Sequence, residues 1–160
     1  MTIQSGDTLP EATFTTPTQN GPEAVTAADF FKGRRVALFS VPGAFTPTCS
    51  AKHLPSYIEK ADALKAKGVD EIACTAVNDA FVMGAWAKSA GAEGKVTMLA
   101  DGNAAFAKAV GLEMDGAKFG MGTRGQRFSM LINDGVVEQI NVEGPGEYKV
   151  SSAEHMLEQL

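Results

Sequence analysis

The sequence predicts an α/β protein with a mixed central β-sheet and helices on both faces of that sheet. Over residues 34–110, short apolar runs typical of buried strands alternate with amphipathic stretches typical of helices. A hairpin signal and a terminal helix follow, so parallel and antiparallel strands are expected in one sheet. At 160 residues, the chain is expected to form a single domain, residues 1–160, with a substantial core.

The first strand and the first helix are expected within residues 34–67. The apolar run inside 34–41 predicts a buried strand, and Pro42 ends it. A helix is predicted from about residue 47 to residue 67, because apolar side chains recur there at helical spacing. These side chains are Leu54, Ile58, Ala61 and Leu64. Pro55 is expected to kink the helix, and Gly68 is expected to cap its end.

Two further strand–helix pairs are predicted downstream. Residues 72–77 form a short apolar run, and Asn78-Asp79 is expected to cap a helix that runs to about Ala90. Residues 96–99 predict a third strand, followed by a helix near 103–110. Strands in such repeated units are expected to be parallel, with functional loops at their carboxyl ends.

The last third of the chain predicts antiparallel structure. Residues 116–125 contain four glycines and are expected to form a loop. Asn133-Asp134-Gly135 is a hairpin signal between two apolar segments. The predicted strands of this hairpin are 127–132 and 136–142. A final helix is expected to begin at Ser151, which has capping-box spacing to Glu154.

Cys49 is the most informative residue for function. Thr46 and Pro47 are expected at the N-cap and the first position of the helix, which places Cys49 at its third position. A thiol there faces unpaired backbone N–H groups and the positive end of the helix dipole, and both favour the reactive thiolate. A lone cysteine is more often an inert, buried side chain. A capping threonine, a proline at the helix start and a strand-end location together favour the reactive interpretation.

These residues carry a family resemblance. The segment Pro42–Ser50, Pro-Gly-Ala-Phe-Thr-Pro-Thr-Cys-Ser, followed by His53-Leu54-Pro55, closely resembles the active-site segment of the peroxiredoxins. It is most similar to the type II, or peroxiredoxin-5-like, branch. The resemblance continues in order along almost the whole chain, through Val77–Val82, Leu99–Asp101, Arg124–Ser129 and Asn141–Glu143. It implies a thioredoxin-like fold and a homodimer.

The resemblance also implies the peroxidase site. It assigns Pro42, Thr46, Cys49 and Arg127 to that site, with Thr46 bonding the peroxide and Pro42 shielding the thiolate from water. Arg124 competes with Arg127 for the role of cationic donor. On an extended segment these two arginines would lie on opposite faces, so one of them is expected to make the main contact. The family motif Arg-Phe-Ser favours Arg127, with Arg124 in support.

His53 lies four residues after Cys49, on the same face of a regular helix, so a Cys–His nucleophile pair is conceivable. The spacing along one helix gives poor geometry for a base, and Pro55 disturbs the backbone. The resemblance implies a supporting role for His53 instead. His155 is expected at the surface. Two histidines and two cysteines without metal-ligand spacing predict no zinc site, and no metal, flavin or haem is expected.

The second cysteine, Cys74, lies in the apolar strand 72–77 and is expected to be buried and unreactive. Some peroxiredoxins have a resolving cysteine near the C-terminus, where residues 148–152 of this chain contain none. An external thiol is therefore expected to recycle Cys49. Glutaredoxin with glutathione is the preferred reductant, and thioredoxin is the second choice.

The resulting hypothesis is a thiol peroxidase that reduces hydrogen peroxide and small alkyl hydroperoxides. The Cys49 thiolate would attack the peroxide and become a sulfenic acid. A redox sensor or relay that passes oxidation to a partner protein uses the same cysteine, so it remains open as the alternative. A holdase chaperone and a cysteine hydrolase are weaker hypotheses, because the sequence predicts neither a large exposed apolar patch nor a well-placed base.

Composition sets the remaining expectations. Charged residues make up 21% of the chain and the net charge is −5, which disfavours a nucleic-acid partner. No apolar run approaches the length of a membrane span, and the first residues lack the pattern of a signal peptide. The two cysteines form no disulfide framework. A reducing, cytoplasmic location is therefore expected.

Overall fold

The computed structural model describes residues 2–160. Its strands are β1 (Thr13–Thr18), β2 (Gly21–Thr26), β3 (Arg35–Ser40), β4 (Glu71–Ala76), β5 (Thr97–Ala100), β6 (Glu113–Asp115), β7 (Thr123–Gly125), β8 (Phe128–Asn133) and β9 (Val136–Val142). Its α-helices are α1 (Ala27–Phe31), α2 (Leu54–Glu59), α3 (Ala61–Ala66), α4 (Ala80–Ala90), α5 (Ala105–Ala109) and α6 (Ala153–Gln159). A π-helical turn, η1 (Cys49–His53), and a 3₁₀ turn, η2 (Ala117–Phe119), complete the set.

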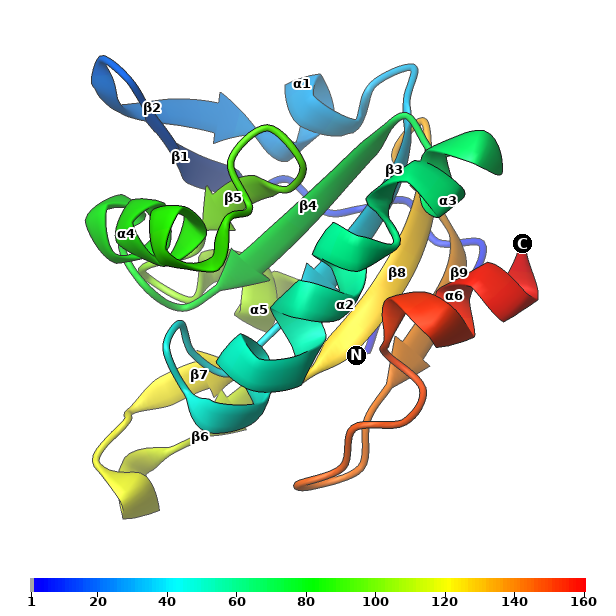
Figure 1. The fold of residues 1–160 in the computed structure, drawn as a ribbon. Coiled ribbons are helices and arrows are strands. Elements are labelled where there is room, and N and C mark those ends of the chain that lie inside the picture. Colours follow the sequence, from blue (N-terminus) through cyan, green and yellow to red (C-terminus); the bar gives the residue numbers. More distant parts are fainter. Residues whose placement is uncertain (1) are drawn as a thin grey trace.

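Seven strands form one mixed sheet in the order β2-β1-β5-β4-β3-β8-β9 (Figure 1). The central strands β3, β4 and β5 are parallel, whereas β8 pairs antiparallel with β3 and β1 pairs antiparallel with β5. The short strands β6 and β7 form a separate two-stranded ribbon. The predicted mixed sheet is therefore confirmed.

Alternate residues of the central strands face two separate cores, because successive side chains of a strand point to opposite faces. One core includes Phe39 and Cys74 and packs against η1, α2, α3, α4 and α6. The other includes Leu38 and Phe128 and packs against α1 and α5. The prediction of helices on both faces is confirmed, and the helix that carries Cys49 lies on the more heavily covered face (Figure 1).

The N-terminal hairpin β1–β2 and the helix α1 were not predicted. The hairpin forms one edge of the sheet, and of its residues only Phe14 is fully buried. Threonines and prolines fill most of the other positions, so the hairpin lacks the apolar run by which a central strand is found. Thr26 caps α1 by accepting a hydrogen bond from the backbone N–H of Asp29 at 3.1 Å.

The single helix predicted over 47–67 is interrupted twice; the first interruption adjoins Pro55, where a kink was predicted, and the second was not predicted. In η1 the backbone N–H of Leu54 bonds the carbonyl of Cys49, five residues back, so the turn is one residue wider than an α-turn. This widened turn directly precedes Pro55, whose ring would clash with the carbonyl four residues back in a regular helix. A second break lies at Lys60, between α2 and α3. Gly68 ends the segment with a φ of 96°, as predicted.

Two predicted caps have different outcomes. Asp79 is the N-cap of α4, as predicted, and its Oδ1 accepts from the backbone N–H of Val82 at 2.8 Å. The cap of α6 is Ser152 rather than Ser151, since Ser152 Oγ accepts from the backbone N–H of His155 at 3.1 Å. The hydroxyl of Ser151 bonds Glu143 instead. Ser152 therefore caps the helix, because the hydroxyl of Ser151 is already bonded to Glu143.

The two glycine-containing segments also differ in outcome. The predicted hairpin of β8 and β9 is confirmed, with Asp134 and Gly135 at φ values of 49° and 80° in its turn. The predicted loop 116–125 is wrong in part, because it contains η2 and the strand β7, which pairs with β6. Its many glycines conceal a three-residue strand too short to show a periodic pattern.

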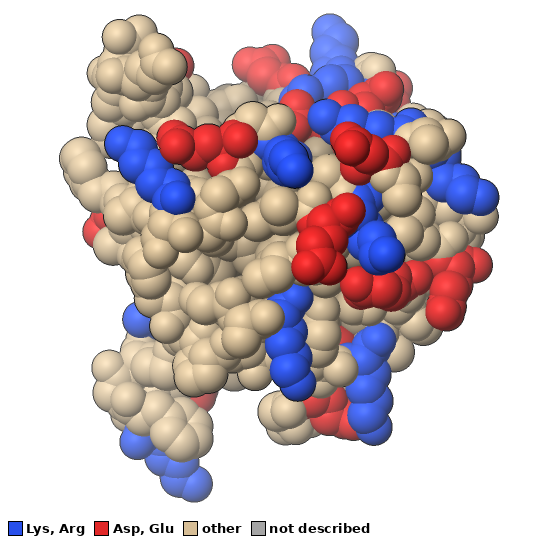
Figure 2. Space-filling model, in the orientation of Figure 1, with Lys and Arg blue, Asp and Glu red and all other residues tan. Residues whose placement is uncertain are grey.

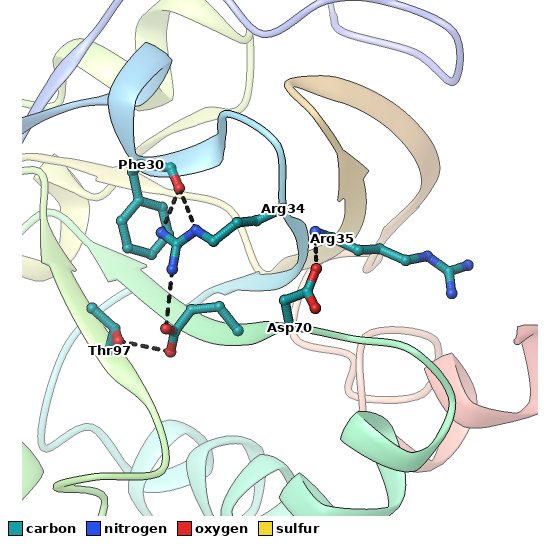
Figure 3. Close-up of polar contacts among 6 residues, drawn as sticks. Phe30, Arg34, Arg35, Asp70 and Thr97 are labelled. Atoms are coloured by element: carbon teal, nitrogen blue, oxygen red, sulfur yellow. Dashed lines mark hydrogen bonds and ion pairs between the residues drawn. The ribbon is translucent and has the colours of Figure 1, made fainter.

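A polar cluster joins the amino ends of the central strands (Figure 3). The guanidinium of Arg34 lies 4.4 Å from the ring centroid of Phe30 and donates to the carbonyl of that residue. It also bonds Glu71 Oε2 at 3.2 Å, while Glu71 Oε1 accepts from the hydroxyl of Thr97 at 2.9 Å. The cluster connects α1 to the starts of β4 and β5, at the end of the sheet opposite to the carboxyl end of β3.

Replacing the N-cap Asp79 with alanine is expected to lower the free energy of unfolding by about 1 kcal/mol, because a side-chain cap of a helix terminus would be lost. Urea denaturation monitored by circular dichroism would measure the change. Glu93 lies in the loop after the same helix, and Glu93→Ala serves as the surface control. Equal stability of the two variants would contradict the cap's contribution.

Candidate active site

The site is built at the carboxyl end of β3, where the chain leaves the sheet at Pro42. Phe45 adopts a left-handed backbone conformation with a φ of 63°, which is uncommon for a residue other than glycine. The backbone N–H of Ala44 donates to Asn78 Oδ1 at 2.9 Å, so the loop after β4 holds the loop after β3. The next segment enters the helix at Pro47, and Cys49 is its third residue.

Cys49 lies in the π-turn η1 and is fully buried. Arg127 Nη2 donates to Cys49 Sγ at 3.1 Å. Arg127 directly precedes β8, and the pairing of Phe128 with Ser40 places it beside the carboxyl end of β3. The antiparallel strand thereby brings a cation from the last third of the chain to the thiol.

The second nitrogen of the same guanidinium contacts His53. Arg127 Nη1 lies 2.9 Å from His53 Nδ1, and His53 Nε2 lies 2.9 Å from the carbonyl oxygen of Ser151. A carbonyl only accepts, so Nε2 carries the proton and Nδ1 accepts from Arg127. Burial of the ring, together with the neighbouring Arg127 charge, lowers the pKa of His53 to about 3. The imidazole is therefore neutral, and both of its nitrogens are already engaged.

Thr46 borders the site but does not form the predicted side-chain cap. Its hydroxyl donates to the carbonyl of Gly43 at 2.7 Å, while its own carbonyl accepts from the backbone N–H of Ser50 at 2.9 Å. Thr46 thus starts the helical bonding through its backbone. The hydroxyl oxygen keeps acceptor capacity on the side that is not bonded to Gly43.

Comparisons with known proteins agree with this geometry. A family model described as Redoxin matches residues 4–157. Peroxiredoxin-2E-2, chloroplastic, from Oryza sativa subsp. japonica is 51% identical over 99% of this chain and 73% of its own length. Peroxiredoxin-2B from Arabidopsis thaliana is 45% identical over 99% of this chain and 98% of its own length.

The chain belongs to the peroxiredoxin family. Among solved structures, the crystal structure of reduced Prx3 in complex with H2O2 from Vibrio vulnificus superposes with a TM-score of 0.95. Its sequence is 54% identical to this one, and the match covers 98% of this chain and 98% of the Prx3 chain. The thioredoxin-like fold that the sequence resemblance implied is thus confirmed. Peroxiredoxins are thiol peroxidases, so this chain is an enzyme of that class, as the resemblance also implied.

Arg124 does not contact the thiol in this peroxiredoxin. It lies in β7, where its Nε donates to the carbonyl of Met121 at 2.9 Å and its Nη1 donates to the carbonyl of Pro42 at 3.4 Å. The structure therefore places Arg127 against Cys49 and Arg124 against the loop that carries Pro42. The two arginines hold different parts of one site.

Cys74 lies in β4 and is fully buried in the same core as Cys49. Burial raises the pKa of the Cys74 thiol well above its usual range. Both cysteines are free thiols. His155, predicted at the surface, lies in α6 and is partly exposed. Among residues 2–160, no three His, Cys, Asp or Glu side chains are grouped so that they could hold a metal ion.

Sequence reasoning missed the residues that hold His53 in place. The ring of Phe39 stacks on that of Tyr57 at 4.1 Å between centroids, and Tyr148 meets His53 edge-on at 5.2 Å. The hydroxyl of Tyr57 donates to the same Ser151 carbonyl at 2.9 Å. Glu143 lies in the segment Asn141–Glu143, which is part of the family resemblance, but the sequence alone assigns it no role. Contacts across more than ninety positions leave no signal in local spacing.

Proposed function

We propose that Cys49 is the peroxidatic cysteine of this thiol peroxidase. Its thiolate attacks the terminal oxygen of hydrogen peroxide or of a small alkyl hydroperoxide. A sulfur–oxygen bond forms and the oxygen–oxygen bond breaks, which leaves a sulfenic acid at Cys49 and releases water or an alcohol after proton uptake. The contact of 3.1 Å between Arg127 Nη2 and Cys49 Sγ carries this proposal, because a fixed cation favours the thiolate.

The neighbouring residues have distinct proposed roles. Arg127 stabilises the thiolate and the negative charge on the departing oxygen, and His53 holds its guanidinium. Thr46 bonds the peroxide through its hydroxyl. Pro42 shields the thiolate from water, and Arg124 fixes the Pro42 carbonyl. The Cys–His nucleophile pair is not part of this mechanism, because His53 Nδ1 already accepts from Arg127.

An external thiol then reduces the sulfenic acid, with glutaredoxin and glutathione as the first choice and thioredoxin as the second. The raised pKa of the buried Cys74 thiol supports an external donor, since a protonated thiol is a poor nucleophile. Peroxide consumption would be measured with each donor system separately. Turnover with either donor identifies the reductant. A single stoichiometric oxidation without turnover would favour the redox sensor or relay instead.

Replacing Cys74 with serine is expected to retain most of the turnover with either donor, because Cys74 is buried and its thiol is held protonated. Steady-state peroxide consumption and single-turnover oxidation of Cys49 would be compared with wild type. A variant that undergoes the first oxidation but fails to recycle would show that Cys74 is a resolving residue.

A homodimer is also proposed. Three phenylalanines are exposed: Phe45 in the loop after β3, Phe81 in α4 and Phe119 in η2, with exposed fractions of 53%, 74% and 78%. The side of the molecule that carries α4 is largely uncharged in the view of Figure 2. Exposed aromatic side chains of this kind are typical of interfaces. Sedimentation velocity of wild type and Phe81→Asp would test this, since a monomeric wild type contradicts it.

A cytoplasmic location is proposed from the two free cysteines, which suit a reducing compartment. None of the helices formed by residues 2–160 combines the length and apolar character needed to cross a membrane. Cell fractionation with an antibody against the native protein would test the location. Recovery in a compartment other than the cytoplasm would contradict it.

A further inference from the structure

One carboxylate organises the segment between β9 and α6. Glu143 is almost fully buried, and its backbone N–H donates to the carbonyl of Arg127 at 3.0 Å. Its Oε2 accepts from the backbone N–H of Lys149 at 2.7 Å, and from the backbone N–H and hydroxyl of Ser151 at 2.8 and 2.6 Å. All three donors converge on one oxygen, so the position of Ser151 depends on this carboxylate.

Ser151 in turn fixes the proton of His53. The Ser151 carbonyl accepts from His53 Nε2, which keeps His53 Nδ1 free of a proton and able to accept from Arg127. The hydroxyl of Tyr57 donates to the same carbonyl, so the oxygen has two buried partners. Burial alone would raise the pKa of Glu143, but the hydrogen bonds from Ser151 and Lys149 outweigh burial and lower it. The carboxylate is therefore ionised when it holds Ser151.

We infer that Glu143 is a positioning residue for the reaction of Cys49, acting through Ser151 and His53 on the Arg127 guanidinium. This inference rests on the proposed roles of Cys49 and Arg127. If the Ser151 carbonyl leaves its place, the imidazole proton is no longer confined to Nε2. With a proton on Nδ1, His53 would present a donor to the N–H donor of Arg127. Two donors repel each other, so the guanidinium would turn away from Cys49 Sγ.

The test compares Glu143→Ala with Glu147→Ala in the full chain. Glu147 lies in the same segment, but it is exposed and pairs only with the ammonium of Lys149, at 2.8 Å. The single tryptophan, Trp86, reports oxidation directly, because its indole N–H donates to Ser50 Oγ, next to Cys49, at 3.0 Å. Stopped-flow fluorescence is expected to show oxidation by hydrogen peroxide about 10-fold slower in Glu143→Ala, and changed less than about twofold in Glu147→Ala.

The imidazole gives a readout that a loss of stability alone would not move. Nitrogen-15 spectra of His53 are expected to show one tautomer in wild type and Glu147→Ala, with the proton on Nε2, and a mixture of tautomers in Glu143→Ala. Glu143→Gln keeps an acceptor oxygen and is expected to restore both the single tautomer and most of the rate. If Glu143→Ala fails to fold, Glu143→Met takes its place in both measurements, because it removes the acceptor oxygen while it nearly conserves the buried volume.

Two results would overturn the inference. One is an unchanged oxidation rate in a folded Glu143→Ala. The other is a slower rate with the His53 tautomer intact, because the effect would then not pass through His53. The wild type tests the proposed function separately in the same experiment. Oxidation of its Cys49 by hydrogen peroxide does not depend on the result for any Glu143 variant.

Discussion

Cys49→Ser is expected to consume peroxide no faster than the uncatalysed reaction, with either reductant. A serine hydroxyl is not ionised near neutral pH, and the site offers no free base to activate it, because both nitrogens of His53 are engaged. The loss should therefore span several orders of magnitude. Peroxide consumption would be followed with the glutaredoxin and thioredoxin systems in parallel.

Cys74→Ser is the matched control for this change, because it removes the other free thiol from the same core. A sulfenic-acid trap combined with mass spectrometry should label residue 49 in wild type and in Cys74→Ser, and nothing in Cys49→Ser. Retained turnover in a folded Cys49→Ser would defeat the mechanism. Labelling of Cys74 in wild type would show that its burial does not protect it.

Arg127→Gln is expected to slow the oxidation of Cys49 by roughly 100-fold, which is the usual cost of removing one fixed donor from a developing anion. The change removes the charge opposite Cys49 Sγ, and the shorter amide also loses the contact that Arg127 Nη1 makes with His53 Nδ1. Arg127→Lys should recover only part of the rate, because a single ammonium cannot span both contacts as the guanidinium fork does. Stopped-flow oxidation by hydrogen peroxide would measure all three proteins.

Arg124→Gln is the matched control for Arg127. Arg124 lies in the same part of the chain but donates to Met121 and Pro42 rather than to the thiol. We expect its effect to be less than about 10-fold, because only the placement of the loop is disturbed. Equal effects of the two substitutions would show that the contact between Arg127 and Sγ is not what accelerates the reaction.

The central strands and the site loop could be predicted because their signals are local. The apolar runs of β3, β4 and β5, the hairpin turn at Asp134 and the cap at Asp79 each occupy a few consecutive positions. The edge hairpin β1–β2 escaped prediction because half-exposed threonines and prolines show no apolar run. Pro55 marked where the helix would be disturbed, but a proline alone does not specify that the preceding turn widens by one residue, so the π-turn itself escaped prediction.

Prediction of the site divides in the same way. Cys49, Thr46 and Pro42 lie in one short segment, and the family motif supplied Arg127. That motif also favoured Arg127 over Arg124, and the pairing of Phe128 with Ser40 supplies the physical reason, because it places Arg127 beside the carboxyl end of β3. The links from His53 to Ser151 and on to Glu143 depend on long-range packing, so no local spacing could disclose them.

The wide turn at Cys49–His53 also sets the rotational phase of the helix. One residue of an α-helix corresponds to about 100° of rotation, so a single extra residue turns everything before it by that amount relative to everything after it. Tyr57, stacked on Phe39, anchors the later half to the sheet. The extra residue therefore rotates the earlier half so that Cys49 faces Arg127. An unbroken α-helix that kept Tyr57 in its place would point Cys49 in another direction.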